Sequence, residues 1–145
     1  IWEPHGYNAR HGLGEDAIIL PSPDVYQTTF NFVVMKDFAE DNPEALEKFI
    51  MAIDKATAYV ENNKVESQNI VADRLSLDRE IMISSWDDFV FEVSLDQSLI
   101  ITLEAEARWA IANDLTDATE VPNYLEYLYL DILDEVKPEA VGIIH

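Results

Sequence analysis

The sequence has 145 residues, of which 48% are hydrophobic, so it is long enough for a folded domain with a core and is not typical of a disordered chain. Its 29 acidic and nine basic residues give a formal net charge of −20. This charge argues against nucleic-acid binding, which needs basic patches to contact phosphates. The absence of cysteine excludes disulfides, thiolate metal sites, iron–sulfur clusters and a cysteine nucleophile within these residues.

The N-terminal residues 1–29 contain most of the glycines and half of the prolines, and we expect them to be irregular apart from a short buried strand at residues 17–20. Residues 30–36 (FNFVVMK) combine aromatic and β-branched side chains and predict a second strand. Asn31 interrupts this apolar run. Its amide suits either a hydrogen bond to a ligand or a bond to the local backbone, and the sequence leaves both open.

From residue 42 onward the pattern is helical. Asn42, Pro43 and Glu44 indicate a helix start, with an N-cap, a proline at the first position and an acid in the first turn. Apolar residues then follow at helical spacing as far as residue 60. We expect further helices at residues 66–75, from about residue 78, after a cap at Ser94 or Asp96, and at residues 123–136, with an extended stretch at residues 89–93.

These elements predict the α/β class, mostly helical, with two or three strands. Isolated strands leave backbone N–H and C=O groups unpaired, so we expect that they either join a partner chain's sheet or belong to a sheet whose other strands lie upstream. The sequence also begins at Ile1 with no charged-then-apolar leader, and no apolar run approaches the roughly 20 residues of a membrane helix. We therefore interpret the chain as a piece of a longer protein.

Several stretches resemble the solute-binding proteins of ABC transporters for nitrate, taurine, aliphatic sulfonates and the thiamine-precursor pyrimidine. The matching stretches are residues 2–4 (WEP), 29–34 (TFNFVV), 36–38 (KDF), 42–44 (NPE), 93–99 (VSLDQSL), 107–111 (ARWAI), 121–125 (VPNYL) and 136–141 (VKPEAV). They follow the order of that family over nearly the whole chain. No single stretch is diagnostic, but the ordered set is fairly specific.

The resemblance implies the C-terminal part of a two-lobed periplasmic-binding-protein fold of type II. Residues 1–29 would end the second lobe and approach the hinge, and residues 30–145 would supply the return strand and the C-terminal helices of the first lobe. It implies capture of a small solute such as nitrate, a sulfonate or taurine between the lobes, and delivery to ABC permease subunits. The protein would be periplasmic or extracellular, held at the membrane only through the permease or an upstream lipid anchor.

The same resemblance places residues 2–4 at the cleft, where an aromatic wall and a polar group suit a small ligand. We therefore predict Trp2, Glu3 and Asn31 as ligand-binding residues. The alternative for the first two is a buried tryptophan and an acid in a turn. His5 and His11 fit no zinc spacing, and the acidic turn at residues 114–120 lacks the glycine of a calcium loop, so no metal or other cofactor is expected.

Two other functions compete with transport. One branch of the family makes the thiamine pyrimidine, but that branch needs a cysteine-rich segment, and this chain has no cysteine. No Gly-x-Ser-x-Gly motif or histidine-supported serine is present either, so we expect no enzyme activity. The other alternative is a ligand-binding sensory module. We also expect the isolated chain to self-associate, because its strand edge and apolar helix faces would lack their sheet.

The charge generates the first testable prediction. Uncompensated negative charges repel within a small volume, and salt screens that repulsion. The melting temperature should therefore rise between low salt and molar NaCl, measured by circular dichroism. A flat or falling trend would show that the acidic side chains are locally paired.

Overall fold

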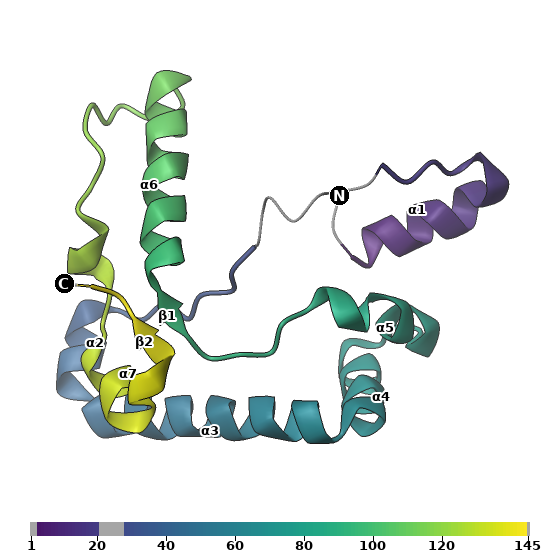
Figure 1. Cartoon of the computed structure of the whole chain (residues 1–145), viewed down its shortest axis with the longest axis horizontal. Coiled ribbons are helices and arrows are strands. Elements are labelled where there is room, and N and C mark those ends of the chain that lie inside the picture. Colours follow the sequence, from purple (N-terminus) through teal and green to yellow (C-terminus); the bar gives the residue numbers. More distant parts are fainter. Residues whose placement is uncertain (1–2, 21–27, 145) are drawn as a thin grey trace. The chain divides into compact units, whose positions relative to one another are not determined.

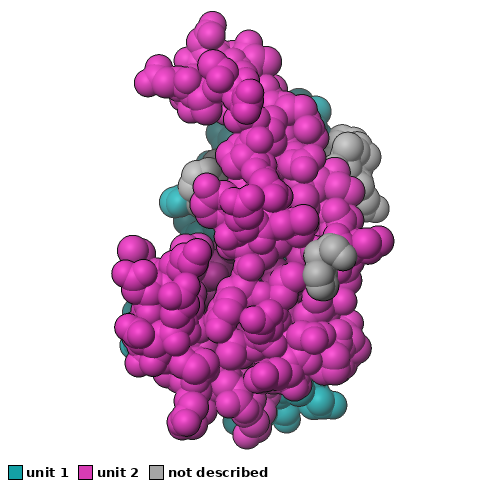
Figure 2. Space-filling view, turned by 90° about the vertical axis from the view of Figure 1, so that its left-hand side faces the viewer, with its two compact units in different colours: residues 1–28, 57–91 teal, residues 29–56, 92–145 magenta. Residues whose placement is uncertain are grey.

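The computed structural model describes residues 3–20 and 28–144. It divides into two compact units, coloured separately in Figure 2. Unit 1 comprises Ile1–Thr28 and Thr57–Phe91, and unit 2 comprises Thr29–Ala56 and Glu92–His145. Trp2 lies outside the described residues. Helix α3 (Pro43–Asn62) contributes residues to both units, which are described in turn below.

Unit 1 is helical throughout its regular elements (Figure 1). Besides the C-terminal part of α3, it contains α1 (His5–Leu13), α4 (Lys64–Leu75), α5 (Arg79–Ser85) and two 3₁₀ turns, η1 (Gly14–Asp16) and η2 (Trp86–Asp88). Its core cluster consists of Ala72, Ile81 and Met82, with Tyr7, Val71 and Leu77 packed against it. Through Tyr7, α1 packs against α4 and α5.

The turn between α4 and α5 is specified by local backbone chemistry. Ser76 adopts a left-handed conformation with φ 54°, and the N–H of Leu77 donates to the carbonyl of Ala72 over 3.0 Å. This six-residue hydrogen-bonded closure is a Schellman-type helix end. Asp78 then caps α5 by accepting a hydrogen bond from the N–H of Glu80 at 2.9 Å. A tight turn therefore holds the two helices of the core together.

Unit 2 combines helices with two short parallel strands. In order it contains α2 (Lys36–Asp41), the first part of α3, β1 (Leu95–Asp96), α6 (Gln97–Ala112), η3 (Tyr124–Tyr127), α7 (Asp131–Val136), η4 (Pro138–Ala140) and β2 (Val141–Gly142). β1 leads directly into α6, and β2 lies beside β1, with Leu95 opposite Val141 and Asp96 opposite Gly142 (Figure 1). The buried hydrophobic side chains of this unit are Ala39, Leu99, Ile100, Ile132, Leu133, Ala140 and Ile143.

Most predicted helices are confirmed. α3 starts at Pro43, α4 covers the predicted residues 66–75, α5 follows Asp78, and α6 follows Asp96 as its N-cap. The described chain is mostly helical with two short parallel strands, which is compatible with the α/β class. The predicted helix at residues 123–136 is interrupted, because Leu128 takes extended backbone angles between η3 and α7.

The predicted strands are wrong. Residues 17–20 form no strand, and Ile18, Ile19 and Leu20 are exposed. Residues 30–35 lie in no strand either, and Lys36 begins α2. Both runs have strand-like composition, but no strand in the described ranges pairs with them. The expectation that residues 1–29 are irregular was also wrong, since they contain α1.

The core of unit 1 generates a stability prediction. Ile81 is 6% exposed and Ile83, on the same helix, is 62% exposed. Ile81→Ala should destabilise the unit by about 2–5 kcal/mol, because it leaves a cavity, whereas Ile83→Ala should change stability by about 0.5 kcal/mol or less. Urea unfolding followed by Trp86 fluorescence, with Trp2 and Trp109 replaced by phenylalanine, measures both. Equal losses would contradict the assigned core.

Candidate ligand-binding residues

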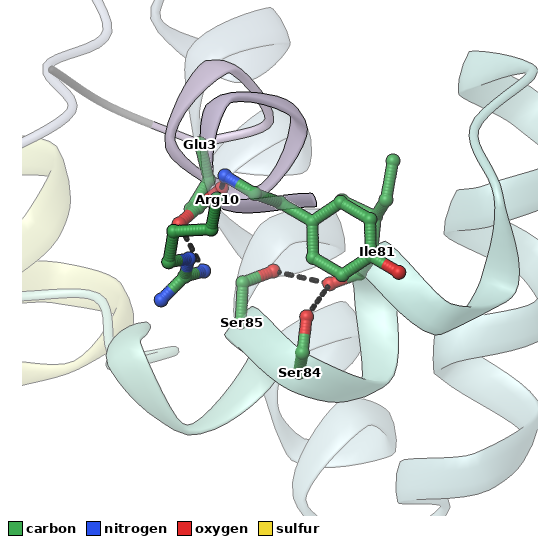
Figure 3. A network of polar contacts seen from close by, with 6 residues as sticks. Glu3, Arg10, Ile81, Ser84 and Ser85 are labelled. Carbon is green, nitrogen blue, oxygen red and sulfur yellow. Dashed lines mark hydrogen bonds and ion pairs between the residues drawn. The ribbon is translucent and has the colours of Figure 1, made fainter. Parts of the chain in front are cut away.

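Both carboxylate oxygens of Glu3 bind groups of α1. One carboxylate oxygen accepts a hydrogen bond from the backbone N–H of Tyr7 at 2.7 Å, and the other forms an ion pair with Arg10 at 3.0 Å (Figure 3). A Cβ atom on Gly6 would lie 2.9 Å from this carboxylate, so the glycine leaves room for it to cross the first helical turn. A negative charge here also complements the helix dipole. Glu3 therefore acts as the cap that the N-cap residue, Pro4, cannot provide with a side chain.

Tyr7 connects this cap to α5. Its hydroxyl donates to Glu80 at 3.3 Å, and its ring stacks on His11 with centroids 5.8 Å apart. Burial raises the pKa of the Tyr7 phenol, and the charge of Glu80 and the hydrogen bond to it raise that pKa further, while Arg10 lowers it. The phenol therefore stays protonated and keeps donating its hydrogen bond throughout the neutral range.

The serines of α5 are also engaged within their own helix. Ser84 and Ser85 both donate to the carbonyl of Ile81, at 3.0 and 2.7 Å (Figure 3). Ser85 is fully buried, and such bonding to the preceding turn is a common way for a helical serine to satisfy its hydroxyl. On α4, the hydroxyl of Ser67 is buried with no hydrogen-bond partner. The hydroxyls of Ser67 and Ser85 are therefore buried, whereas Ser84 is exposed and its hydroxyl is bound to its own helix.

Asn31 lies in unit 2, in the non-helical stretch that precedes α2. Its side chain is exposed, and its amide donates only a long hydrogen bond, 3.4 Å, to the hydroxyl of Thr29. The next residue, Phe32, contacts Phe49 of α3 edge-on, with ring centroids 5.0 Å apart. The amide of Asn31 is thus available to solvent, and its role as a ligand-binding residue stays a prediction.

The pair formed by Lys137 and Asp54 was missed by sequence reasoning. Their charged atoms are 2.7 Å apart and both side chains are half-buried, joining the end of α7 to α3 within unit 2. The hydrogen bond to Asp54 raises the pKa of Lys137, and partial burial opposes that rise. The two residues are 83 positions apart, so no local pattern could have revealed the contact.

Within the described ranges, no group of three or more histidine or carboxylate side chains could hold a metal ion. No helix in those same ranges has the length and apolar character needed to cross a membrane. No family model, curated protein or solved structure matches the chain.

The cap at α1 generates a local prediction. In Glu3→Ala the N–H of Tyr7 loses its acceptor, so its hydrogen exchange should accelerate about fivefold, equivalent to the ~1 kcal/mol of a lost cap. Glu15→Ala, which removes the same charge from η1, is the control and should leave that amide unchanged. Equal acceleration in both variants would show that net charge, and not the cap, is responsible.

Proposed function

We propose that the chain is part of the solute-binding component of an ABC importer, which captures a small solute such as nitrate, a sulfonate or taurine and delivers it to the permease. The observation that carries this proposal is the ordered set of stretches that resemble the nitrate, sulfonate and taurine binding proteins, from residues 2–4 to residues 136–141. The protein acts by binding, without chemistry on the solute. In this proposal the chain supplies the C-terminal part of a two-lobed type II fold.

Two structural features support the proposal without deciding it. The mostly helical content, with a parallel strand pair leading into α6, is compatible with an α/β lobe. The apolar residues 30–35 are exposed, as expected for a segment whose sheet neighbours come from another part of a protein. The predicted lobe boundary between residues 29 and 30 stays a prediction.

Affinity in such a protein comes from enclosing the solute. A single hydrogen bond from an exposed amide such as Asn31 contributes about 0.5–1.5 kcal/mol, whereas micromolar binding requires about 8 kcal/mol. Enclosure between two lobes adds many contacts and excludes water, and hinge closure completes the site. In this proposal we therefore expect the 145 residues alone to bind such a solute weakly.

The proposal is tested by calorimetry with nitrate, taurine and methanesulfonate, on the 145-residue chain and on the full translation product of its gene. The full product should bind one of these solutes at micromolar concentration, and the 145-residue chain should show no binding. In the full product, Asn31→Ala should weaken binding about five- to tenfold through the lost hydrogen bond. Asn8→Ala, at another exposed asparagine, is the matched control.

Two outcomes would contradict the proposal in different ways. Micromolar binding by the 145-residue chain would show that no further lobe is needed. A full product that binds none of the three solutes would remove the assigned substrate class.

A further inference from the structure

Two corners of the chain have the same backbone geometry. Asn42, between α2 and α3, has φ −133° and ψ 49°, and Asn63, between α3 and α4, has φ −134° and ψ 48°. At each corner the backbone N–H and the side-chain amide of the asparagine both donate to one carbonyl four residues earlier. The distances are 3.0 and 3.1 Å to Phe38, and 2.9 and 3.0 Å to Tyr59. Each corner is therefore a single non-helical residue between two helices (Figure 1).

The residues that follow the two asparagines differ. Pro43 has no N–H, and a proline disfavours the helical region for the residue before it, so α2 and α3 stay separate at Asn42. Asn63 is followed by Lys64, and residues 60–67 (VENNKVES) contain neither proline nor glycine. The backbone at Asn63 is therefore free to adopt helical angles, whereas the backbone at Asn42 is not.

The hydrogen bonds around Asn63 are already close to those of a continuous helix. Its N–H donates to the carbonyl of Tyr59, and its carbonyl accepts from the N–H of Ser67 at 2.9 Å, so both bonds keep the four-residue spacing of an α-helix. Between these two bonds, the described structure gives the N–H groups of residues 64–66 no backbone partner. Helical angles at Asn63 would pair them with the carbonyls of residues 60–62.

The contacts at this corner are mainly polar. α3 is described over its whole length and none of its residues is buried, whereas α4 packs on α5 through the core cluster of unit 1. Across the corner, Tyr59 of α3 forms a hydrogen bond with Glu66 of α4. This bond, partial burial and the charge of Glu66 raise the pKa of the Tyr59 phenol, so the phenol stays protonated and keeps its bond in the neutral range.

We propose that the corner at Asn63 is a hinge with two states, the bent state of the structure and a straight state in which α3 and α4 form one helix from residue 43 to residue 75. The straight state gains three backbone hydrogen bonds. It loses the bond between Tyr59 and Glu66, because two helical turns, about 10 Å, then separate these residues. The core between α4 and α5 stays intact, so the pair turns as one body relative to the end of α3.

Asparagine suits a residue that leaves the helix in one state and joins it in the other. Its amide can bond the preceding turn in either state, as Asn62 does inside α3, where it donates to the carbonyl of Ala58 at 2.7 Å. Its helix propensity is lower than that of alanine, which favours the bent state and still permits the straight one. The inference concerns unit 1 alone and does not rest on the proposed function.

Double electron–electron resonance on the 145-residue chain tests the proposal. Spin labels are attached at Lys55→Cys on α3 and Arg74→Cys on α4, two exposed positions in a chain that has no cysteine of its own. In one straight helix the two labelled Cα atoms would lie about 29 Å apart, at a rise of about 1.5 Å per residue, and a bend at Asn63 shortens that distance. The wild-type corner should give mainly the shorter distance.

Substitutions at the corner should shift the ratio of the straight to the bent population. Asn63→Ala should raise it about threefold, since alanine favours helical angles where the bent state has none. Asn62→Ala is the matched control and should leave the ratio unchanged, because residue 62 is helical in both states. Tyr59→Phe should raise the ratio about fivefold through the lost bond across the corner.

A proline provides the opposite test. Adding Lys64→Pro to Asn63→Ala should remove the long distance, because it reproduces the order of residues at Asn42 and Pro43. Adding Lys64→Ala instead should keep the long distance, although it removes the same ion pair with Asp87.

Three results would overturn the proposal. The first is the absence of a component near 29 Å in Asn63→Ala. The second is an equal shift in Asn62→Ala, since the change would then not depend on the corner. The third is a long distance that persists with Lys64→Pro, because a continuous helix could not then be its source. The replaced side chains lie outside the buried core, so the far-ultraviolet circular dichroism of each variant should show a folded, helical chain.

Discussion

An extended segment keeps its place in a fold only when its backbone N–H and C=O groups find partners, and this requirement divides the extended parts of the chain into two kinds. Residues 95–96 and 141–142 pair with one another, and the pairing continues where the side chain of Gln97 accepts a hydrogen bond from the N–H of Ile144. Residues 28–34 have no such partners in the described structure. The position of α6 after β1 and the exposure of the apolar residues 30–35 both follow from this difference.

The same requirement explains which elements the sequence could predict. A helix is specified by neighbours in the chain, so the local start signals at residues 42–44, 78 and 96 were enough to locate α3, α5 and α6, although only Asp78 accepts a side-chain cap bond there. A strand needs a partner distant in sequence, and composition does not show whether that partner is present. The aromatic and β-branched residues 30–35 fit a strand by composition, yet they form none, while the strands that do form are each 2 residues long, too short for composition to reveal.

The candidate site, like the fold, could be predicted from the sequence only in part. The resemblance singled out Glu3 for its carboxylate, and the structure shows that this carboxylate is occupied by the first turn of α1 and by Arg10. That interaction also explains why α1 was missed: glycines and a preceding proline predict a loop, and the side-chain cap together with the packing of Tyr7 on the core compensates for them. The contact between Lys137 and Asp54 depends on how α7 folds back to α3, which no local pattern encodes.

The net negative charge acts over a longer distance than the exposed apolar side chains of residues 30–35. Nine basic residues cannot neutralise 29 acidic ones whatever the pairing, and surface ion pairs such as Lys48 with Glu44 contribute at most about 1 kcal/mol. The remaining repulsion reaches across a Debye length and keeps unrelated acidic surfaces apart. The exposed apolar side chains of residues 30–35 act only on contact. The acidity therefore limits non-specific association even though apolar side chains of residues 30–35 are exposed.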